Sequence, residues 1–266
     1  MFDEVFTRIK QGHQTLKYPG GPPPLLPARF RGRPLIDERK CVAGCVACVE
    51  VCPTQAISGD ERHRIDLGKC LFCTDCVDAC PENAISHQQD YRLATSRRED
   101  LVVAGDEELR LAEVLDTKLR RLFGRSLHLR QVSAGGCNAC EADVNVLGTI
   151  GWDIGRFGIQ IVASPRHADG LLVTGCITEN MKLALQKTYA AVPPPKIVIA
   201  VGACAISGGP FAGNPQQHNG ASFVLPVDLF IPGCPPHPLT ILDGLLRLMG
   251  RLEKDQQRFR ETEDGL

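Results

Sequence analysis

The sequence lacks several features that would assign a function at once. Its 30 Lys and Arg side chains nearly balance 31 Asp and Glu, and this formal net charge of −1 argues against a nucleic-acid partner. No apolar run approaches the ~20 residues that a membrane-spanning helix needs. No Gly-Lys-Ser/Thr phosphate-binding signature occurs. The first residues, Met1 to Glu4, form no basic-then-apolar signal segment, which predicts a cytoplasmic protein.

Cysteine is the residue type in excess. The chain has 13 cysteines in 266 residues, against one Trp, three Tyr and ten Phe. An odd number of cysteines in a reducing compartment suits metal thiolates better than a disulfide framework. The length and the 43% hydrophobic content fit a globular protein of two domains.

Eight cysteines form an internal repeat. Its second half is Cys70-x2-Cys73-x2-Cys76-x3-Cys80-Pro81, the run that bacterial ferredoxins use for [4Fe–4S] clusters. Its first half is Cys41-x3-Cys45-x2-Cys48-x3-Cys52-Pro53, with one extra residue, Gly44 or a neighbour, in the first gap. In this motif three cysteines bind one cluster and the fourth reaches the other. We therefore expect one cluster on Cys41, Cys45, Cys48 and Cys80, and a second on Cys70, Cys73, Cys76 and Cys52.

Two alternatives stay open for this block. A pair of zinc sites would use the same thiolates structurally, although the interleaved order and the two Cys-Pro pairs favour clusters. The extra residue between Cys41 and Cys45 is either a tolerated bulge or a change that leaves the first cluster altered.

The block resembles the two-cluster ferredoxin subunit of complex I, formate hydrogenlyase and related membrane hydrogenases. The resemblance covers roughly residues 1–105. It is supported by Phe30-Arg31-Gly32-Arg33-Pro34, by Leu67-Gly68-Lys69-Cys70 and by Asp90-Tyr91-Arg92-Leu93-Ala94.

The second half of the chain alternates short apolar runs with helical stretches. The expected strands are Leu127–Val132, Ile159–Ala163, Gly170–Thr174, Ile197–Val201 and Asp228–Ile231. The expected helices are Ala142–Ile150, Glu179–Tyr189 and Leu239–Lys254. This alternation predicts an open parallel sheet. The remaining five cysteines, Cys137, Cys140, Cys176, Cys204 and Cys234, all follow strands, where such sheets gather their ligand sites.

This half resembles the small subunit of energy-converting [NiFe] hydrogenases, which is similar to the 20 kDa subunit of complex I. The motifs that support it include Gly135-Gly136-Cys137-Asn138-Ala139-Cys140-Glu141 and Pro232-Gly233-Cys234-Pro235-Pro236. The resemblance implies a third [4Fe–4S] cluster on Cys137, Cys140, Cys204 and Cys234. Cys176 is either a buried small residue or an additional thiolate near that cluster. Glu141 is either a proton relay toward a large subunit or an ordinary helix carboxylate.

We thus expect an α+β two-cluster ferredoxin domain followed by an α/β open parallel-sheet (flavodoxin-like) domain. The expected segments are a proline-rich arm with a possible amphipathic helix (1–36), the ferredoxin domain (37–105), a connector helix (106–125), the α/β domain (126–254) and a polar tail (255–266).

The sequence shows no set of residues typical of acid–base catalysis, so we expect the chain to be an electron-transfer subunit. The resemblance implies a group 4-like [NiFe] hydrogenase or formate hydrogenlyase complex on the cytoplasmic face of the membrane. Its partners would be a [NiFe]-hydrogenase-like large subunit, membrane-embedded antiporter-like subunits, and an electron donor or acceptor protein. The alternatives are a complex I-like quinone-reducing module and a structural zinc scaffold.

Overall fold

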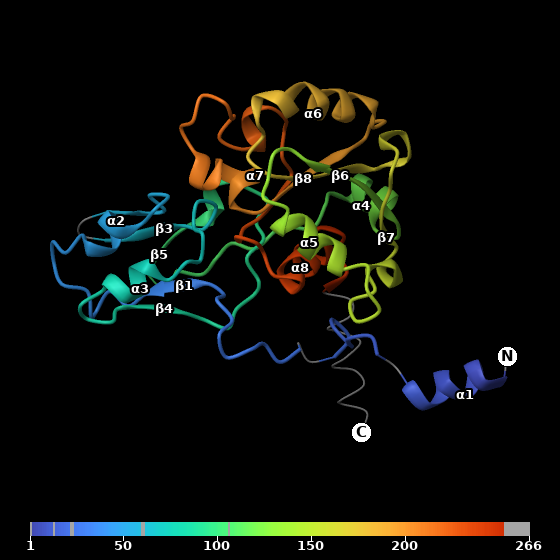
Figure 1. The fold of residues 1–266 in the computed structure, drawn as a ribbon, viewed down its shortest axis with the longest axis horizontal. Helices are drawn as coiled ribbons and strands as arrows, with labels where there is room; N and C mark the ends of the chain where they lie inside the picture. The colour runs from blue at the N-terminus through green and yellow to red at the C-terminus, as the bar shows by residue number, and fades with distance from the viewer. Residues whose placement is uncertain (1, 13, 22–23, 60–61, 106, 253–266) are drawn as a thin grey trace.

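The computed structural model describes residues 2–12, 14–21, 24–59, 62–105 and 107–252. Figure 1 shows a lobe built from the repeat segment beside a larger α/β body. The helix α1 (Phe2–Gln11) projects from the body, which confirms the predicted N-terminal helix. The predicted polar tail, 255–266, lies outside the described residues.

The lobe is a small antiparallel structure. The strand β1 (Pro34–Ile36) pairs with β4 (Ile85–His87), and β2 (Ile57–Ser58), β3 (Arg64–Asp66) and β5 (Val102–Ala104) form a second sheet in the order β2-β3-β5. Two short helices, α2 (Ala47–Val51) and α3 (Asp75–Ala79), contact each other.

The backbone repeats with the sequence in this lobe. Gln55 and Asn83 occupy equivalent positions after the two Cys-Pro pairs, and both have positive φ, 51° and 49°. A residue other than glycine adopts this conformation rarely, and Asn is among the types that do so more readily. The internal repeat therefore extends from the cysteine spacing to the turn that follows each Cys-Pro.

The body contains the predicted parallel sheet. The strands are β6 (Leu127–Ser133), β7 (Ile159–Ile161), β8 (Gly170–Thr174), β9 (Ile197–Val201) and β10 (Leu229–Ile231). They are hydrogen-bonded in the order β10-β9-β8-β6-β7, and every pair is parallel. All residues of β8 and β9 are buried, as expected for central strands covered on both faces.

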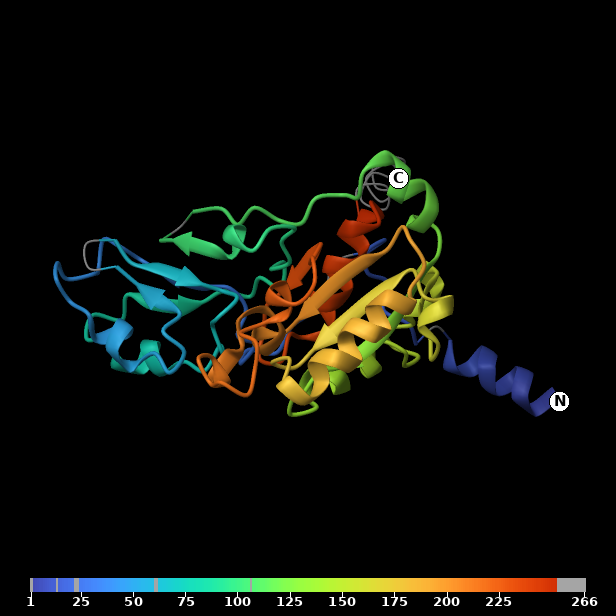
Figure 2. The same cartoon turned by 90° about the horizontal axis from the view of Figure 1, so that it is seen from above.

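Helices cover both faces of this sheet (Figure 2). Leu172 points to the core shared with α5 (Ala139–Val146) and α8 (Pro238–Leu248), whereas its neighbours Leu171 and Val173 point to the core shared with α6 (Glu179–Ala191) and α7 (Ala203–Ser207). This alternation follows from the two-residue period of a strand. The second core continues into the lobe through residues such as Leu67 and Leu101, so the lobe and the body share apolar packing.

The predicted connector helix was wrong over most of its length. Only α4 (Thr117–Phe123) is helical, and residues 107–116 have no regular secondary structure. The Asp116 carboxylate caps the helix by accepting hydrogen bonds from the N–H groups of Lys118 and Leu119. Before it, Ala112 and Leu115 donate backbone N–H groups to Ala94 and Leu248, so the leucine-rich segment lies along the body instead of coiling.

Several other helix boundaries also differ from the prediction, since α5 ends at Val146 and not at Ile150, and α6 ends at Ala191 and not at Tyr189. The helix α5 begins at Ala139, three residues before the expected start, and α8 ends at Leu248 instead of Lys254. Residues 253 and 254 lie outside the described chain.

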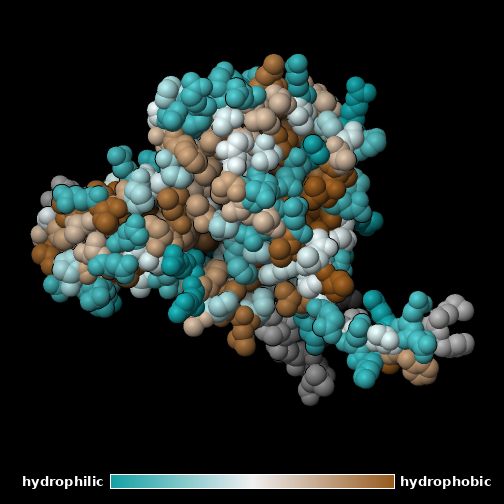
Figure 3. Space-filling model, viewed as in Figure 1, coloured by the Kyte–Doolittle hydropathy of each residue, from teal (hydrophilic) through white to brown (hydrophobic). Residues whose placement is uncertain are grey.

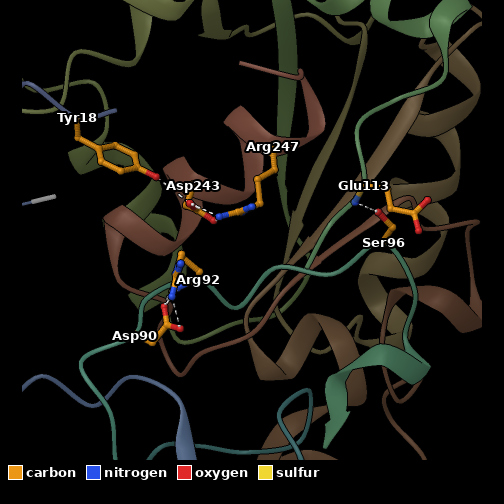
Figure 4. A network of polar contacts seen from close by, with 7 residues as sticks. All are labelled: Tyr18, Asp90, Arg92, Ser96, Glu113, Asp243 and Arg247. Atoms are coloured by element: carbon orange, nitrogen blue, oxygen red, sulfur yellow. Dashed lines mark hydrogen bonds and ion pairs between the residues drawn. The ribbon is translucent and has the colours of Figure 1, made fainter. Parts of the chain in front are cut away.

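The proline-rich arm is fixed to the body by the arm clasp, which consists of Tyr18, Asp243 and Arg247 (Figure 4). The Tyr18 hydroxyl donates to Asp243 Oδ1 at 2.7 Å, and Arg247 Nε donates to Asp243 Oδ2 at 2.7 Å. Asp243 is fully buried in α8, so both of its partners compensate for the loss of water. Arg156 adds hydrogen bonds to the backbone carbonyls of Leu16 and Tyr18.

The helix α1 presents an apolar side to solvent. Val5, Phe6 and Ile9 are 54%, 69% and 72% exposed, and Figure 3 shows hydrophobic residues on this projecting helix. Within the described ranges, none of the helices has the length and apolar character that crossing a membrane requires.

Candidate iron–sulfur centres

The first four-cysteine set lines one small cavity in the lobe. Cys41, Cys45, Cys48 and Cys80 surround it together with apolar neighbours that include Ile36, Ala84 and Ile85. Burial raises the pKa of the Cys41 and Cys48 thiols, and the other thiols of the set raise it further. Four thiols close together in an apolar pocket suit an iron–sulfur cluster, whose iron ions bind cysteines as thiolates.

The extra residue of the first gap lies in an exposed loop. Gly44 has a φ of 75°, and no atom comes within 4 Å of the position that a Cβ would occupy. Val42, Ala43 and Gly44 are all exposed. The loop therefore bulges toward solvent, and its longer spacing does not prevent Cys41 and Cys45 from facing the same cavity.

The second set lines a separate cavity in the lobe. Its thiols are Cys52, Cys70, Cys73 and Cys76, and Phe72, Thr54 and His87 complete the wall. Burial raises the pKa of Cys70 to about 12 and of Cys76 to about 11. The last cysteine of each motif thus joins the cavity of the other motif, since Cys80 lines the first cavity and Cys52 the second.

Backbone N–H groups point at three of these sulfurs. Ala56 N donates to Cys52 Sγ at 3.2 Å, and its repeat equivalent, Ala84 N, donates to Cys80 Sγ at 3.3 Å. Phe72 N donates to Cys70 Sγ, also at 3.3 Å. Such N–H groups stabilise negative charge on thiolate sulfur. Cys52 and Cys80, which each join the cavity of the other motif, therefore accept a hydrogen bond from equivalent backbone N–H groups.

The third set gathers at the carboxyl ends of the parallel strands. Cys137 and Cys140 follow β6, Cys204 lies in α7 after β9, and Cys234 follows β10. Burial raises the pKa of Cys204 to about 12, with further contributions from Cys234, Cys176 and Cys137. Burial is likewise the main cause that raises the pKa of Cys140. The charge of Glu141 and the other three thiols of the set raise it further. The sheet topology thus brings together four cysteines that span almost a hundred residues.

A glycine makes room for one of these sulfurs. Gly202 has a φ of 91°, and a Cβ at this position would stand 2.5 Å from Cys140 Sγ. Any larger residue would collide with the thiol in addition to straining the backbone. The loop before Cys204 is therefore shaped around the sulfur of Cys140.

The residues present fit [4Fe–4S] clusters, because each of the three sets offers four cysteine thiols. In the described part of the chain, no three His, Cys, Asp or Glu side chains converge as a single metal ion would require. The thiols of the lobe instead surround cavities.

The three sets are neighbours in a row. The thiols that raise the pKa of Cys76, after burial, include Cys48 of the first set. Burial and then Cys137 raise the pKa of Cys234, and Cys73 of the second set adds to this. Phe72 and Cys234 also line one shared cleft between the lobe and the body. The second set therefore lies between the other two.

Cys176, the thirteenth cysteine, is buried behind the third set. Its Sγ donates to the backbone carbonyl of Gly135 at 3.4 Å, and burial raises its pKa. It is close enough to Cys204 to affect that thiol's pKa. Its hydrogen bond supports the loop before Cys137, which is the behaviour of a buried structural residue.

Glu141 is held in place by two hydroxyl groups. Its Oε1 accepts hydrogen bonds from Ser133 Oγ and Thr174 Oγ1, both at 2.6 Å. Burial works to raise the pKa of Glu141, but these two hydrogen bonds, together with a backbone hydrogen bond, lower the pKa below its ordinary value. The two hydroxyls tie the first turn of α5 to β6 and β8. The proton-relay role of Glu141 stays a prediction.

Two residues near the thiols make contacts that the sequence analysis did not predict. His63 is 2% exposed, and its Nδ1 lies 3.7 Å from Cys41 Sγ. Arg31 Nη1 donates to the carbonyls of Phe72 and Cys73 at 3.0 and 3.1 Å, which joins the arm to the loop of the second set. Neither residue belongs to the cysteine repeat, so only the folded chain reveals them.

Comparison with known proteins finds one family match in each half of the chain. Residues 40–84 match a family described as "4Fe-4S dicluster domain", and residues 137–248 match "NADH ubiquinone oxidoreductase, 20 Kd subunit". The chain is 38% identical to the probable membrane-bound hydrogenase subunit mbhJ of Pyrococcus furiosus, over 57% of this chain and 91% of that protein.

Two further relatives come from different complexes. Formate hydrogenlyase subunit 7 of Escherichia coli is 40% identical over 53% of this chain and 55% of its own length. An NADH-quinone oxidoreductase subunit of Heliobacterium modesticaldum is 37% identical over 55% of this chain and 85% of its own length.

These findings define an iron–sulfur protein that joins two modules in one chain. The N-terminal module is a 4Fe-4S dicluster ferredoxin domain, which supports two clusters. The chain belongs to the NADH ubiquinone oxidoreductase 20 kDa subunit family through its C-terminal module, and the predicted fusion is confirmed.

Proposed function

We propose that this chain is an electron-transfer subunit carrying three [4Fe–4S] clusters. The first is held by Cys41, Cys45, Cys48 and Cys80, the second by Cys52, Cys70, Cys73 and Cys76, and the third by Cys137, Cys140, Cys204 and Cys234. A bound [4Fe–4S] cluster accepts and releases single electrons, and this chain's residues hold it, exclude water from it and set its potential.

The observation that carries the proposal is the crossing of the two ferredoxin motifs. Two cavities are each lined by four thiols, and each set takes three cysteines from one motif and one from the other. Such an exchange is the ligand pattern of the bacterial ferredoxin run, in which the fourth cysteine binds the other cluster. The strand order, with the third set at the carboxyl edge, supports a flavodoxin-like body for the third cluster.

The row of sets supports an order of transfer. The first set lies in the lobe beside an exposed loop at Val42, and the second lies between it and the third. We infer that electrons pass between a partner protein at the exposed loop and an active site beyond Cys137 and Cys234, whose side chains are exposed.

We further propose that the complex is a membrane-associated, group 4-like [NiFe] hydrogenase or formate hydrogenlyase. Its large subunit would hold the active site next to the third set, and membrane-embedded antiporter-like subunits would hold the chain on the cytoplasmic face. The relatives from a membrane-bound hydrogenase and a formate hydrogenlyase support this assignment. The exposed apolar side of α1 supports contact with partner subunits.

A complex I-like module that reduces quinone is the second candidate, because NADH-quinone oxidoreductase subunits are among the relatives. The spacing Cys137-x2-Cys140 resembles that of hydrogenase small subunits, whereas complex I versions have two adjacent cysteines at this site, and this favours the first candidate. The large subunit that co-purifies with the chain decides between them. Two Cys-x-x-Cys pairs and bound nickel in that subunit would support the hydrogenase, and the lack of both would support the quinone module.

The electron-transfer role itself is tested by a reductive titration of the anaerobically purified full chain, followed by electron paramagnetic resonance (EPR). We expect three one-electron centres, with magnetic coupling between the second centre and each of the others. A chain that contains stoichiometric zinc and takes up no electrons would contradict the proposal.

A further inference from the structure

His63 is a buried polar side chain that the electron path does not use. It precedes β3 and is 2% exposed, and its Nδ1 is 3.7 Å from Cys41 Sγ. Its other ring nitrogen, Nε2, has no hydrogen-bond partner among the described residues. A buried imidazole whose one polar contact with the described part of the chain is a cysteine sulfur calls for an explanation beyond packing.

The chemistry of the sulfur determines which atom carries the proton. A cysteine that holds a cluster is a thiolate, which accepts hydrogen bonds and cannot donate one. Nδ1 must therefore be the N–H donor. The opposite tautomer would aim a lone pair at the thiolate and bury an unpaired N–H at Nε2 as well.

The second set also has a histidine beside its cavity, but this histidine does not bond to a cysteine sulfur as His63 does. His87 lines the cavity of Cys52, Cys70, Cys73 and Cys76, but its Nδ1 bonds to the Gly32 carbonyl at 3.1 Å. Its Nε2 also has no partner among the described residues. The polar groups in contact with the sulfurs of that set are the backbone N–H groups of Ala56 and Phe72 and the Thr54 hydroxyl, 3.9 Å from Cys52 Sγ, and no substitution of His87 removes them.

We propose that His63 tunes the first cluster by donating its Nδ1–H to the Cys41 thiolate, which stabilises the more negative, reduced form and raises the cluster's midpoint potential. This inference rests on the proposed function, because it requires a cluster on Cys41. Hydrogen bonds to cluster sulfurs are a principal means by which proteins set these potentials. His63 is thus a positioning and tuning residue for the centre next to the exposed loop at Val42.

The test is an EPR-monitored redox titration of the full chain with His63→Phe, His63→Gln and the matched control His87→Phe. His63→Phe should retain the first cluster and lower its potential by about 59 mV, which is a tenfold shift in the reduced-to-oxidised ratio for one electron. His63→Gln keeps an N–H donor and should recover most of that shift. The second cluster serves as an internal reference in the two His63 variants, and His87→Phe, which alters the wall of the second cavity, should leave the first cluster's potential unchanged.

The outcomes separate this inference from the proposed function. An unchanged potential in His63→Phe, or an equal shift in His87→Phe, would overturn the role of His63 and leave the cluster assignment intact. Loss of the first cluster in both His63 variants would mean a structural role and would also overturn it. A wild-type chain without a first cluster would instead overturn the proposed function at Cys41, Cys45, Cys48 and Cys80.

Discussion

The lobe and the body assemble four-cysteine sets by two different routes. In the lobe, eight cysteines lie within 40 residues and form a duplicated motif. The fourth cysteine of each motif lines the cavity of the other motif, so that two cavities of four thiols result. In the body, four cysteines span 98 residues, and parallel strands bring them to one edge of a sheet. Local spacing determines the first kind of site, whereas the second kind depends on the whole fold.

The largest effect is expected when a cysteine that binds the cluster of the other motif is removed from the lobe. Cys80→Ala should abolish the first cluster and retain the second, although Cys80 belongs to the second motif. Cys52→Ala should do the reverse, because its Sγ faces Cys70, Cys73 and Cys76. Each variant should lose about four of about twelve irons. Assignment of the EPR signals tests this, and loss of the second cluster in Cys80→Ala would contradict the crossing.

The next largest effect is expected in the body, where the third cysteine set depends on the backbone conformation of the loop before Cys204. Gly202→Ala should remove the third cluster, because the new Cβ would stand 2.5 Å from Cys140 Sγ at a φ of 91°. Iron analysis should show a loss of about four irons, with the two lobe clusters retained.

Gly213→Ala is the matched control for Gly202→Ala. Gly213 has a similar φ of 80° in the same body, but no atom lies within 4 Å of its Cβ position. This variant should keep its iron and lose only about 1–2 kcal/mol of stability from backbone strain. Equal iron loss in both variants would show that strain alone, and not the sulfur, explains the result.

A smaller effect tests how the arm holds to the body. Tyr18→Phe removes the hydroxyl that donates to Asp243 and should lower stability by about 1–3 kcal/mol, since Asp243 is fully buried. A thermal melt should show the loss as a decrease in melting temperature. Tyr189→Phe is the control, because the ring and the carbonyl of Tyr189, and not its hydroxyl, contact Lys196. An equal decrease in both variants would contradict the role of the arm clasp.

The smallest effect is expected at the thirteenth cysteine. Cys176→Ser keeps a donor to the Gly135 carbonyl, so the EPR signal and potential of the third cluster should stay at their wild-type values. A changed signal would instead show that Cys176 binds the cluster.

The same comparison explains what could be predicted from the sequence. The thiols of the lobe follow from their spacing, and the strands of the body follow from apolar runs such as Gly170–Thr174. The connector was mispredicted because its leucines pack against the body from an irregular segment, with Asp116 as a helix cap. The contacts of His63 and Arg31 were missed because they join segments that no local pattern relates.

The central claim is that both routes produce [4Fe–4S] sites within one chain. Its most direct test is the iron, acid-labile sulfide and zinc content of the anaerobically purified full chain. We expect about twelve irons and about twelve sulfides per chain, with no stoichiometric zinc. About eight irons would limit clusters to the lobe, and one or two zinc ions in place of iron would contradict the account.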